Sequence, residues 1–587
     1  GVEIHVEGDA AAVRDFVREL PSAAPRASRI ASIDERDADL LGMTSFTIRE
    51  SGEARRPTVR VAPDLPICPE CLAELRDPAD PRHGYPYINC TACGPRFSIV
   101  LGLPYDRPRT TMAGWPLCAR CAEQYHDPDD RRFHAQPVAC PDCGPHFALH
   151  EGTRVTAGDA TAIGGAVRLL REGAIVAVKG IGGYHLACDA TRDETVRSLR
   201  ERKYRKERPF ALMVRDLETA EALVELDAAG RNLLTSSAAP IVLAPARREW
   251  PLVAPDNRDL GVMLPYTPLH HLLFSGGAPP VLVMTSANRS SEPIAFTEED
   301  AFAQLGGIAD AFLAGERPIA RRVDDSIVRS GPFGPQVLRR SRGYSPSAVG
   351  AGWPAEGPVL ALGADLKNSV TLVVGGQAFV SQHVGDLDHV PARESFEAIC
   401  DDLCRMYEIR REALVVAHDR HPDYVSSAWA AHFPGRRVAV QHHRAHVASV
   451  AAECGAWDVP LIGVAFDGTG YGDDGAIWGG EIFAGTLAHG LDRVAHLRPA
   501  ELPGGDAAAL FPPQAAAGFL AQVDGLPDLA PCNAVLDVDG RPKVGRAHDR
   551  GKVRSGDVKL VGLAARGQNE LVIGKVFLPA GGQVPNR

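Results

Sequence analysis

The sequence has no long apolar run and no excess of positive charge. No apolar stretch approaches the roughly 20 residues that a membrane-spanning helix requires, so we expect no membrane span. Lys and Arg total 63 against 74 Asp and Glu, and the net charge of -11 argues against nucleic acid as a partner. A chain of 587 residues exceeds the usual size of one hydrophobic core, so we expect several domains.

Cysteine is sparse outside one region, which argues against a disulfide scaffold. Secreted disulfide-rich domains are short, whereas the 13 cysteines here belong to a long, enzyme-like chain. We therefore expect reduced thiols and a cytoplasmic setting. The chain begins with Gly rather than Met, inside a strand-like run at residues 2–6, and we interpret it as a fragment.

Four CxxC pairs lie close together, and they repeat. Each cysteine of the first two pairs recurs fifty residues later, and Cys-Gly-Pro follows the same step, which indicates an internal duplication. Two CxxC turns complete a tetrahedral shell of four thiolates with no open position, so we predict two structural zinc sites. The ligands are Cys68, Cys71, Cys90, Cys93, Cys118, Cys121, Cys140 and Cys143.

Other readings of these cysteines stay open at this point. Redox-active CxxC motifs, disulfides and an iron–sulfur cluster use the same residue type. Which pairs share one ion does not follow from spacing, although pairing within each repeat is the simplest arrangement.

The segments on either side of the cysteine region read as mixed helix and strand. Asp9 is suited to cap a helix from Ala10 to Leu20, and residues 46–48 have strand composition. From about residue 160 an α/β pattern begins, with a strand at residues 174–178 that runs into a glycine-rich loop. Glycines after a strand let backbone N–H groups approach an anion closely.

Six cations then occur in the nine residues 200–208. A charge run is usually a solvated helix face. Here a later strand at residues 281–284 runs into Thr-Ser-Ala-Asn, which is typical of a polar ligand-binding turn. The two features together favour an anionic ligand.

A second α/β pattern begins after a Pro- and Gly-rich linker, with strands predicted at 359–363, 370–374 and 377–381. Further on, His442 and His446 would share one face of a helix, with Cβ atoms roughly 6 Å apart. An isolated pair of this kind is more often a plain histidine cluster. Asp467, at the end of a predicted strand and followed by glycines, adds an oxygen ligand, so we predict a metal–phosphate site.

These motifs carry a family resemblance. Lys203-x-Arg205 with Ser286-x-Asn288 resembles the YrdC-type nucleotide-binding domain, as do residues 264–268 and 322–326. The following half, with its histidines and Asp-Gly-Thr-Gly, resembles the TsaD-type carbamoyl-transfer domain. The order of parts resembles the hydrogenase maturation carbamoyltransferase family, HypF, over about residues 1–505.

The resemblance implies a multidomain α/β and α+β fold. It places a partial acylphosphatase-like, ferredoxin-like domain at 1–52 and the duplicated zinc module at 62–150. A YrdC-like domain at 155–345 and an incomplete actin-like ATPase domain at 356–505 follow, with an atypical tail at 506–587.

The resemblance also implies the chemistry. Carbamoyl phosphate and ATP would give carbamoyl-adenylate, and the carbamoyl group would pass to the C-terminal cysteine of the partner HypE, as precursor of a cyanide ligand. Expected cofactors are two zinc ions, ATP with magnesium, and a further divalent metal, iron or zinc, at the histidines. Expected nucleotide-binding residues are Lys203, Arg205, Ser286, Asn288, Lys179 and Arg322, and expected catalytic and metal-binding residues are His442, His446 and Asp467.

The sequence departs from the family pattern at both ends. The anion-binding loop of the acylphosphatase domain would precede Gly1, and the late glycine-rich segment and late Asp ligand are not found after about residue 506. We therefore expect impaired carbamoyl transfer, with adenylation by residues 155–345 retained. The alternatives are carbamoyl transfer to tRNA adenosine or a small-molecule hydroxyl, and a zinc-scaffolded binding protein without catalysis.

Overall fold

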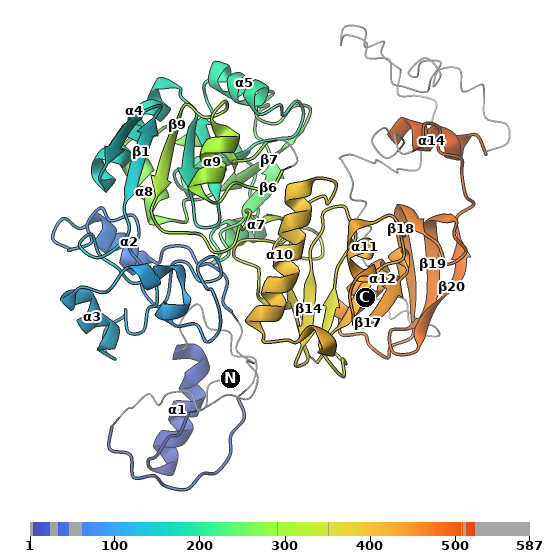
Figure 1. Cartoon of the computed structure of the whole chain (residues 1–587), viewed down its shortest axis with the longest axis horizontal. Helices are drawn as coiled ribbons and strands as arrows, with labels where there is room; N and C mark the ends of the chain where they lie inside the picture. Colours follow the sequence, from blue (N-terminus) through green and yellow to red (C-terminus); the bar gives the residue numbers. More distant parts are fainter. Residues whose placement is uncertain are drawn as a thin grey trace. The chain divides into compact units, whose positions relative to one another are not determined.

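The structure, a computed structural model, describes residues 4–23, 33–45, 61–289, 292–349, 352–505, 508 and 512–522. The chain divides into two compact units. The first comprises Gly1–His418 and Tyr424–Val438, and the second comprises Asp419–Asp423 and Ala439–Arg587. Figure 1 colours them along the chain, from blue to orange. Among the described residues, none of the helices has the length and apolarity that a bilayer crossing demands.

The amino-terminal segment contains one helix, α1 (Ala10–Ala23). It begins where the sequence predicts, because the Asp9 carboxylate accepts hydrogen bonds from the backbone N–H groups of Ala11 and Ala12, both at 3.0 Å. Residues 4–6, part of the expected first strand, are not in a strand. The strand expected at 46–48 lies outside the described residues.

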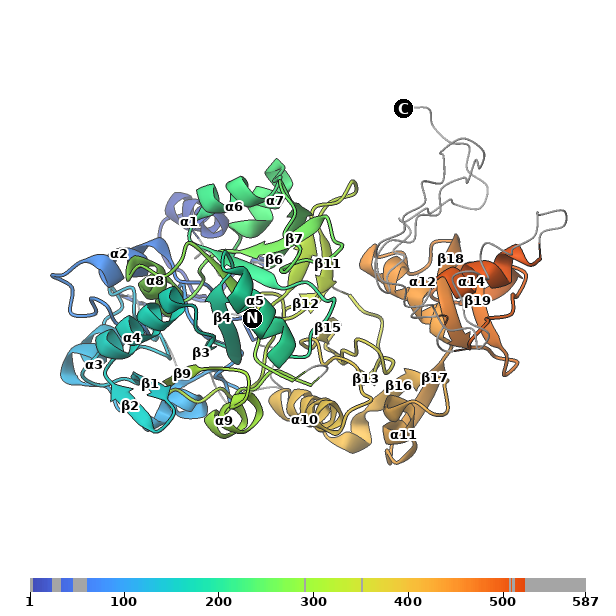
Figure 2. The ribbon, with the colours of Figure 1, turned by 90° about the horizontal axis from the view of Figure 1, so that it is seen from above.

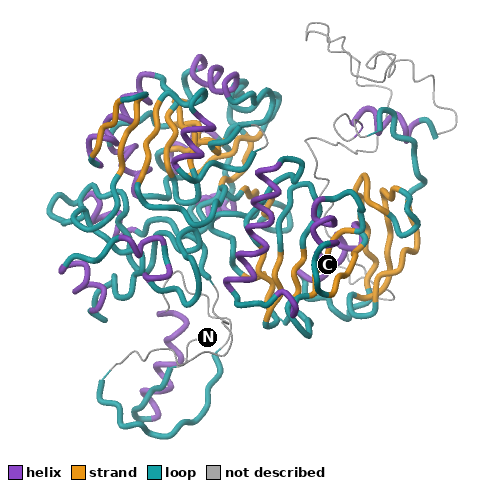
Figure 3. The backbone as a smooth tube through the Cα atoms, in the orientation of Figure 1, coloured by secondary structure: helices purple, strands orange, loops and turns teal. Residues whose placement is uncertain are grey.

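The cysteine-rich region is mostly loop, as the teal tube in Figure 3 shows. Its short helices are α2 (Pro69–Arg76), η1 (Arg107–Arg109), η2 (Thr111–Gly114) and α3 (Ala119–His126). Helices α2 and α3 each start immediately after the first cysteine of a repeat, so the CxxC turn and the helix N-terminus are one structure.

The expected YrdC-like domain is built on an eleven-stranded mixed sheet of order β11-β10-β6-β7-β5-β8-β4-β3-β9-β1-β2. Its strands are β1 (Phe147–Glu151), β2 (Arg154–Ala157), β3 (Val176–Lys179), β4 (Tyr184–Asp189), β5 (Ala211–Val214), β6 (Ile241–Pro245), β7 (Asp259–Met263), β8 (Val281–Ser286), β9 (Ala311–Gly315), β10 (Ile327–Arg329) and β11 (Gln336–Arg339). Its helices are α4 (Asp159–Glu172), α5 (Asp193–Arg202), α6 (Leu217–Leu223), α7 (Ala228–Leu234), α8 (Pro268–Ser275) and α9 (Glu298–Leu305).

Helix α4 shows why the helices of this domain pack on the sheet. Its buried residues recur at helical spacing, so one apolar stripe faces the sheet: Ala162, Ile163, Ala166, Val167 and Leu170. The helix ends at Gly173, whose φ of 92° is the left-handed conformation that glycine adopts without strain. Buried cysteines of the first repeat belong to the same apolar cluster as α4, so the zinc module packs directly on this domain.

A six-stranded sheet of order β12-β15-β14-β13-β16-β17 follows. Its elements are β12 (Ala348–Val349), β13 (Val359–Ala361), β14 (Thr371–Val374), β15 (Gln377–Val380), α10 (Val390–Met406), η3 (Arg411–Ala413), β16 (Val415–Asp419), α11 (Val425–Ala431) and β17 (Arg436–Val440). The three predicted strands correspond to β13, β14 and β15, which form an antiparallel meander, and β16 then joins β13 in parallel.

The second unit contains a three-stranded antiparallel sheet and the helix that carries the histidines. The elements are α12 (His442–Glu453), β18 (Leu461–Tyr471), β19 (Ile477–Thr486), β20 (Gly490–His496) and α14 (Pro512–Leu520). Figure 2 shows α12 lying against β18. Of the atypical tail expected at 506–587, only residues 508 and 512–522 are described.

One expectation for this unit differs from the structure. The segment from Asp467 to Tyr471 was expected to be a glycine loop after a strand, but it continues β18 and bulges between Phe466 and Gly470. A Cβ atom on Gly470 would lie 2.6 Å from the ring of His443. This glycine therefore lets the strand pack closely on α12.

Candidate functional sites

The eight CxxC cysteines form two separate clusters, one within each repeat. In the first, neighbouring Sγ atoms lie 3.6 to 3.8 Å apart, and in the second 3.6 to 3.7 Å. Four thiolates at 2.3 Å from a tetrahedral zinc ion would be about 3.8 Å apart, so both donor sets fit zinc. The first cluster is buried, whereas Cys118 and Cys143 of the second are half-buried.

The two repeats exchange arginines, a feature that spacing alone did not indicate. Arg82 of the first repeat donates to the carbonyl of Ala139 at 2.9 Å and to the Cys121 thiolate at 3.2 Å. Arg132, fifty residues later, donates to the carbonyl of Asn89 at 3.2 Å and pairs with Glu74. Each cluster therefore depends on cations supplied by the other repeat.

The exchange is not symmetric, because Arg131 has Pro81 as its counterpart. Arg131 donates to the Cys71 thiolate at 3.2 Å and to Glu74 at 3.1 Å. Hydrogen bonds from cations to thiolates offset the negative charge of a four-cysteine zinc site. Cations therefore offset more of the negative charge of the first cluster than of the second.

We expect Arg131→Ala to release zinc from the first cluster about tenfold faster, because a charge-assisted hydrogen bond contributes about 1.5–3 kcal/mol. A chromophoric zinc chelator added to the zinc-loaded protein measures the rate. Arg120→Ala, on the exposed surface of the same repeat, is the matched control. Identical release by Arg131→Ala and the parent chain would contradict the assigned role.

The second unit holds the predicted histidine cluster. His442 and His446 stand one turn apart on α12, with their Nε2 atoms 3.2 Å apart. The carboxylate of Asp467 lies 2.8 Å from His442 and 3.4 Å from His446. The three side chains thus converge with ligand atoms within 4.8 Å of one another, and two imidazoles with one carboxylate form a donor set that suits iron or zinc.

Asp419, at the end of β16, is a site residue that sequence reasoning missed. Its carboxylate accepts a hydrogen bond from Nδ1 of His442 at 2.7 Å, which leaves Nε2 facing the cluster. A carboxylate on the far nitrogen fixes the orientation of a metal-binding histidine. The only sign in the sequence that Asp419 belongs to the site is its position at the end of a strand.

The charges around His442 are strongly coupled. Burial alone would lower the pKa of His442, but the bonds to Asp419 and Asp467 overcome burial and raise it to about 9. Burial would raise the pKa of Asp467, and the two histidines hold it well below its usual range. A metal ion here would therefore replace a proton on His442, so binding releases protons at neutral pH.

We expect Asp419→Asn to weaken metal binding at this cluster about 10- to 100-fold, because an amide orients the imidazole less firmly than a carboxylate. Equilibrium competition with a metal-binding dye measures the affinity. Asp423→Asn changes the same charge on an exposed residue nearby and serves as control. Equal affinities for Asp419→Asn and the control would contradict the positioning role.

The predicted nucleotide residues of the eleven-stranded sheet partly converge. Lys203, 2% exposed, donates to the carbonyls of Ser286 and Asn288 at 2.8 and 2.6 Å, and to the side-chain oxygen of Asn288 at 2.5 Å. The Ser286 hydroxyl donates to the same oxygen at 3.1 Å. Burial, then the nearby Arg205, lower the pKa of Lys203 to about 7.

Of the other three predicted residues, Lys179 and Arg322 contact the segment that follows Asn288, and Arg205 lies in the basic segment 200–208. Lys179 donates to the Gly315 carbonyl at 2.5 Å and pairs with Glu298 at 3.3 Å, and burial lowers its pKa. Arg322 lies over the ring of Phe296, 4.8 Å from its centre. Arg205 turns back onto its own loop, and burial lowers its pKa to about 10.

The fold and these sites define a zinc-scaffolded, multidomain transferase of α/β type. Family models match successive parts of the chain: HypF finger at 67–100 and 117–150, Telomere recombination (Sua5/YciO/YrdC) at 168–341, HypF Kae1-like domain at 354–453, and Carbamoyltransferase, Kae1-like Domain, second subdomain at 463–544. The chain belongs to the HypF carbamoyltransferase family.

Relatives and solved structures agree with this assignment. Carbamoyltransferase HypF2 of Cupriavidus necator is 46% identical over 89% of this chain and 67% of its own length. Carbamoyltransferase HypF of Synechocystis is 44% identical over 89% and 68%. A full-length HypF crystal structure in the phosphate- and nucleotide-bound form has a TM-score of 0.81 at 41% identity, covering 87% of this chain and 67% of that one.

The comparisons confirm the predicted family and fold class, and the finger matches support the two zinc clusters. The match to the second Kae1-like subdomain reaches residue 544, beyond the boundary expected near 505. The chain spans about two thirds of the length of these relatives.

Proposed function

We propose that this carbamoyltransferase forms carbamoyl-adenylate from carbamate and ATP on the eleven-stranded sheet. We further propose that the carbamoyl group then passes to the C-terminal cysteine of a HypE-type partner at the His442 cluster. The observation that carries the proposal is the buried Lys203, which is held against the turn of Ser286 and Asn288. A buried amine beside polar turn groups is suited to an anionic ligand.

In the first step, a carbamate oxygen attacks the α-phosphorus of ATP, and the bond from that phosphorus to the leaving oxygen breaks to release pyrophosphate. Negative charge grows on the phosphate oxygens. Lys203 in its charged form, with Arg205 nearby, would stabilise that charge in a site with little water. Ser286 and Asn288 supply hydroxyl and amide groups for the nucleotide, and magnesium would accompany the phosphates.

In the second step, the partner's thiolate attacks the carbamoyl carbon, and the carbon–oxygen bond to AMP breaks. His442, His446 and Asp467 would hold the divalent metal, which supplies Lewis acidity when bound. Asp419 keeps the imidazole of His442 in one orientation. The adjacent Arg444, paired with Asp473 at the same helix end, adds a positive charge for an anionic substrate.

Exchange of labelled pyrophosphate into ATP tests the first step. We expect exchange that depends on carbamoyl phosphate, or on carbamate supplied as bicarbonate with ammonia. No exchange by a folded protein that retains both zinc ions, with either carbamoyl source, would refute the proposal.

The pKa of Lys203 predicts proton uptake on nucleotide binding. Above pH 7 the buried amine of the free protein is mostly neutral, and a bound phosphate favours its charged form, so binding at pH 8 takes up a proton. Calorimetry in two buffers of different ionisation enthalpy measures the uptake. It should vanish in Lys203→Met and persist in Lys206→Met, whose side chain is exposed.

The lowered pKa of Lys203 also makes the folding stability depend on pH. The pKa of Lys203 is lower in the folded protein than its ordinary value of 10.5, so the unfolded chain binds more protons between about pH 7 and 10.5. The Lys203 contribution to folding stability therefore rises with pH across that window.

In the calorimetry, proton uptake by Lys203→Met equal to that of the parent chain would contradict the assignment of the uptake to Lys203.

A further inference from the structure

A small cavity lies between the zinc module and the eleven-stranded sheet. Its volume is about 30 Å³, and Tyr87 and Ile88 of the module face Lys179, Tyr266 and Arg317 of the sheet domain across it. One water needs roughly 10–15 Å³ by this measure, so the space suits a molecule of a few heavy atoms. None of the predicted nucleotide residues except Lys179 lines it.

Arg317, just after β9, is the unusual residue of this cavity. It is 8% exposed, and its guanidinium lies over the ring of Tyr87, 4.8 Å from the centre. Within the described parts of the chain it has no hydrogen bond or ion pair through its side chain. Asp64 acts on it electrostatically; one oxygen of the Asp64 carboxylate accepts from the backbone N–H groups of Arg96 and Ser98, and the other makes no hydrogen bond among the described residues.

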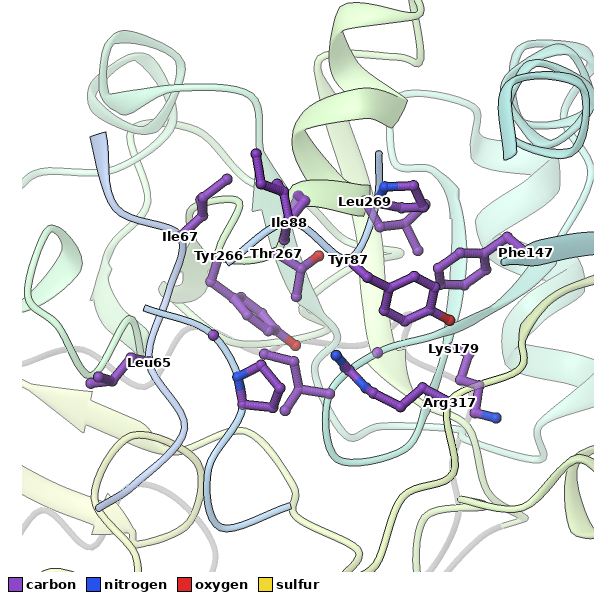
Figure 4. Close-up of a pocket in the computed structure, with 16 residues that line it drawn as sticks. Leu65, Ile67, Tyr87, Ile88, Phe147, Lys179, Tyr266, Thr267, Leu269 and Arg317 are labelled. Atoms are coloured by element: carbon purple, nitrogen blue, oxygen red, sulfur yellow. The ribbon is translucent and has the colours of Figure 1, made fainter. Parts of the chain in front are cut away.

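A buried cation whose side chain makes no direct ion pair or hydrogen bond is costly unless an anion accompanies it. Figure 4 shows the guanidinium of Arg317 reaching toward the middle of the cavity, between the rings of Tyr87 and Tyr266. Its donors thus face the open volume rather than protein acceptors.

A second feature of the same cavity also favours negative charge. The N-terminus of α8 lines it through Thr267, Pro268 and Leu269. Thr267 caps the helix by accepting from the backbone N–H of His270 at 3.1 Å, so the free N–H group of Leu269 remains at this end. Helix N-termini carry partial positive charge and bind anions.

We propose that this cavity binds a small planar oxyanion of the carboxylate and carbonate class, with the Arg317 guanidinium as its principal partner. The planar fork of Arg matches two oxygens of one carboxylate-like group. Lys179, 6% exposed, also lines the cavity, beside Arg317. That the physiological anion is carbamate, the acid to be adenylated, rests on the proposed function.

The assignment gives the zinc module a role beyond scaffolding. Tyr87 and Ile88 stand three and two residues before the zinc ligand Cys90, and Tyr87 stacks on Phe147 with ring centres 4.9 Å apart. Metal binding at the first cluster therefore holds one wall of the anion site in place.

Line broadening of ¹³C-labelled bicarbonate by the protein, without nucleotide, tests the proposal. We expect saturable broadening with the parent chain and with Arg215→Met, whose arginine is exposed and pairs with the neighbouring Asp216. Arg317→Met should weaken binding at least tenfold, and Arg317→Lys should retain part of it. Chloride at equal ionic strength should not compete.

Three results would overturn the proposal: no saturable broadening with the parent chain, unchanged binding by Arg317→Met, or equal competition by chloride. Zinc content and the thermal melt of Arg317→Met establish that it is folded. Because the assay contains no ATP, its failure is separate from a failure of pyrophosphate exchange. Unchanged carbamate dependence of exchange in Arg317→Met would likewise reject the site while leaving adenylation intact.

Discussion

Cys71→Ser is expected to cost the protein one zinc ion and to unfold the cysteine-rich region. Cys71 is fully buried and belongs to the apolar cluster that also contains α4 and β9 residues. Structural zinc contributes about 10–16 kcal/mol to folding in isolated fingers, which matches or exceeds the about 5–15 kcal/mol that keeps a whole domain folded. The loss should therefore spread to the sheet that packs on the module.

Zinc content by mass spectrometry and a circular-dichroism melt measure both effects. Cys454→Ser removes an exposed cysteine outside the clusters and should leave two zinc ions and the melting temperature unchanged. A Cys71→Ser protein with two zinc ions and the parent melting temperature would show that the cysteines are not structural ligands.

His442→Ala is expected to abolish metal binding at the second unit's cluster and to lower carbamoyl transfer by about 100-fold or more. His442 contacts both Asp419 and Asp467, so its removal takes away one ligand and the ion pairs that it makes with both carboxylates. Loss of a ligand costs more than the 10- to 100-fold expected for its supporting carboxylate.

Transfer is measured as labelled carbamoyl on the C-terminal cysteine of a HypE-type protein, and metal by elemental analysis after gel filtration. His489→Ala, an exposed histidine of the same unit, should change neither. Because the two zinc ions of the first unit remain, we expect the number of bound metal ions to fall from three to two. Three ions bound to His442→Ala would place the third metal elsewhere.

Local motifs made much of this molecule predictable. CxxC spacing fixes two thiolates on one turn, so each half of a four-cysteine cluster follows from local sequence, whereas the pairing of the halves comes from the structure. His442 and His446 converge for the same reason, because one helical turn separates them. The polar residues at the strand end near Ser286 supported the prediction of an anion-binding Lys203. In the structure, Lys203 donates a hydrogen bond to the Ser286 carbonyl.

Residues that act across large sequence distances were not predictable in this way. Arg131 reaches Cys71 from sixty positions away, and Asp419 reaches His442 across a whole helix and strand. Arg317 belongs to no motif, and it stands out only because its buried side chain makes no ion pair or hydrogen bond among the described residues. The Asp467–Tyr471 segment differs from the expected loop, because it continues β18 and Gly470 lies close to the ring of His443.

The central claim is that activation and transfer of the carbamoyl group occur at two separate sites of one chain. Carbamate-dependent pyrophosphate exchange, measured side by side for Lys203→Ala and His442→Ala, tests it most directly. We expect Lys203→Ala to lose exchange and His442→Ala to keep the rate of the parent chain. Loss of exchange in a folded His442→Ala protein, or full exchange in Lys203→Ala, would contradict it.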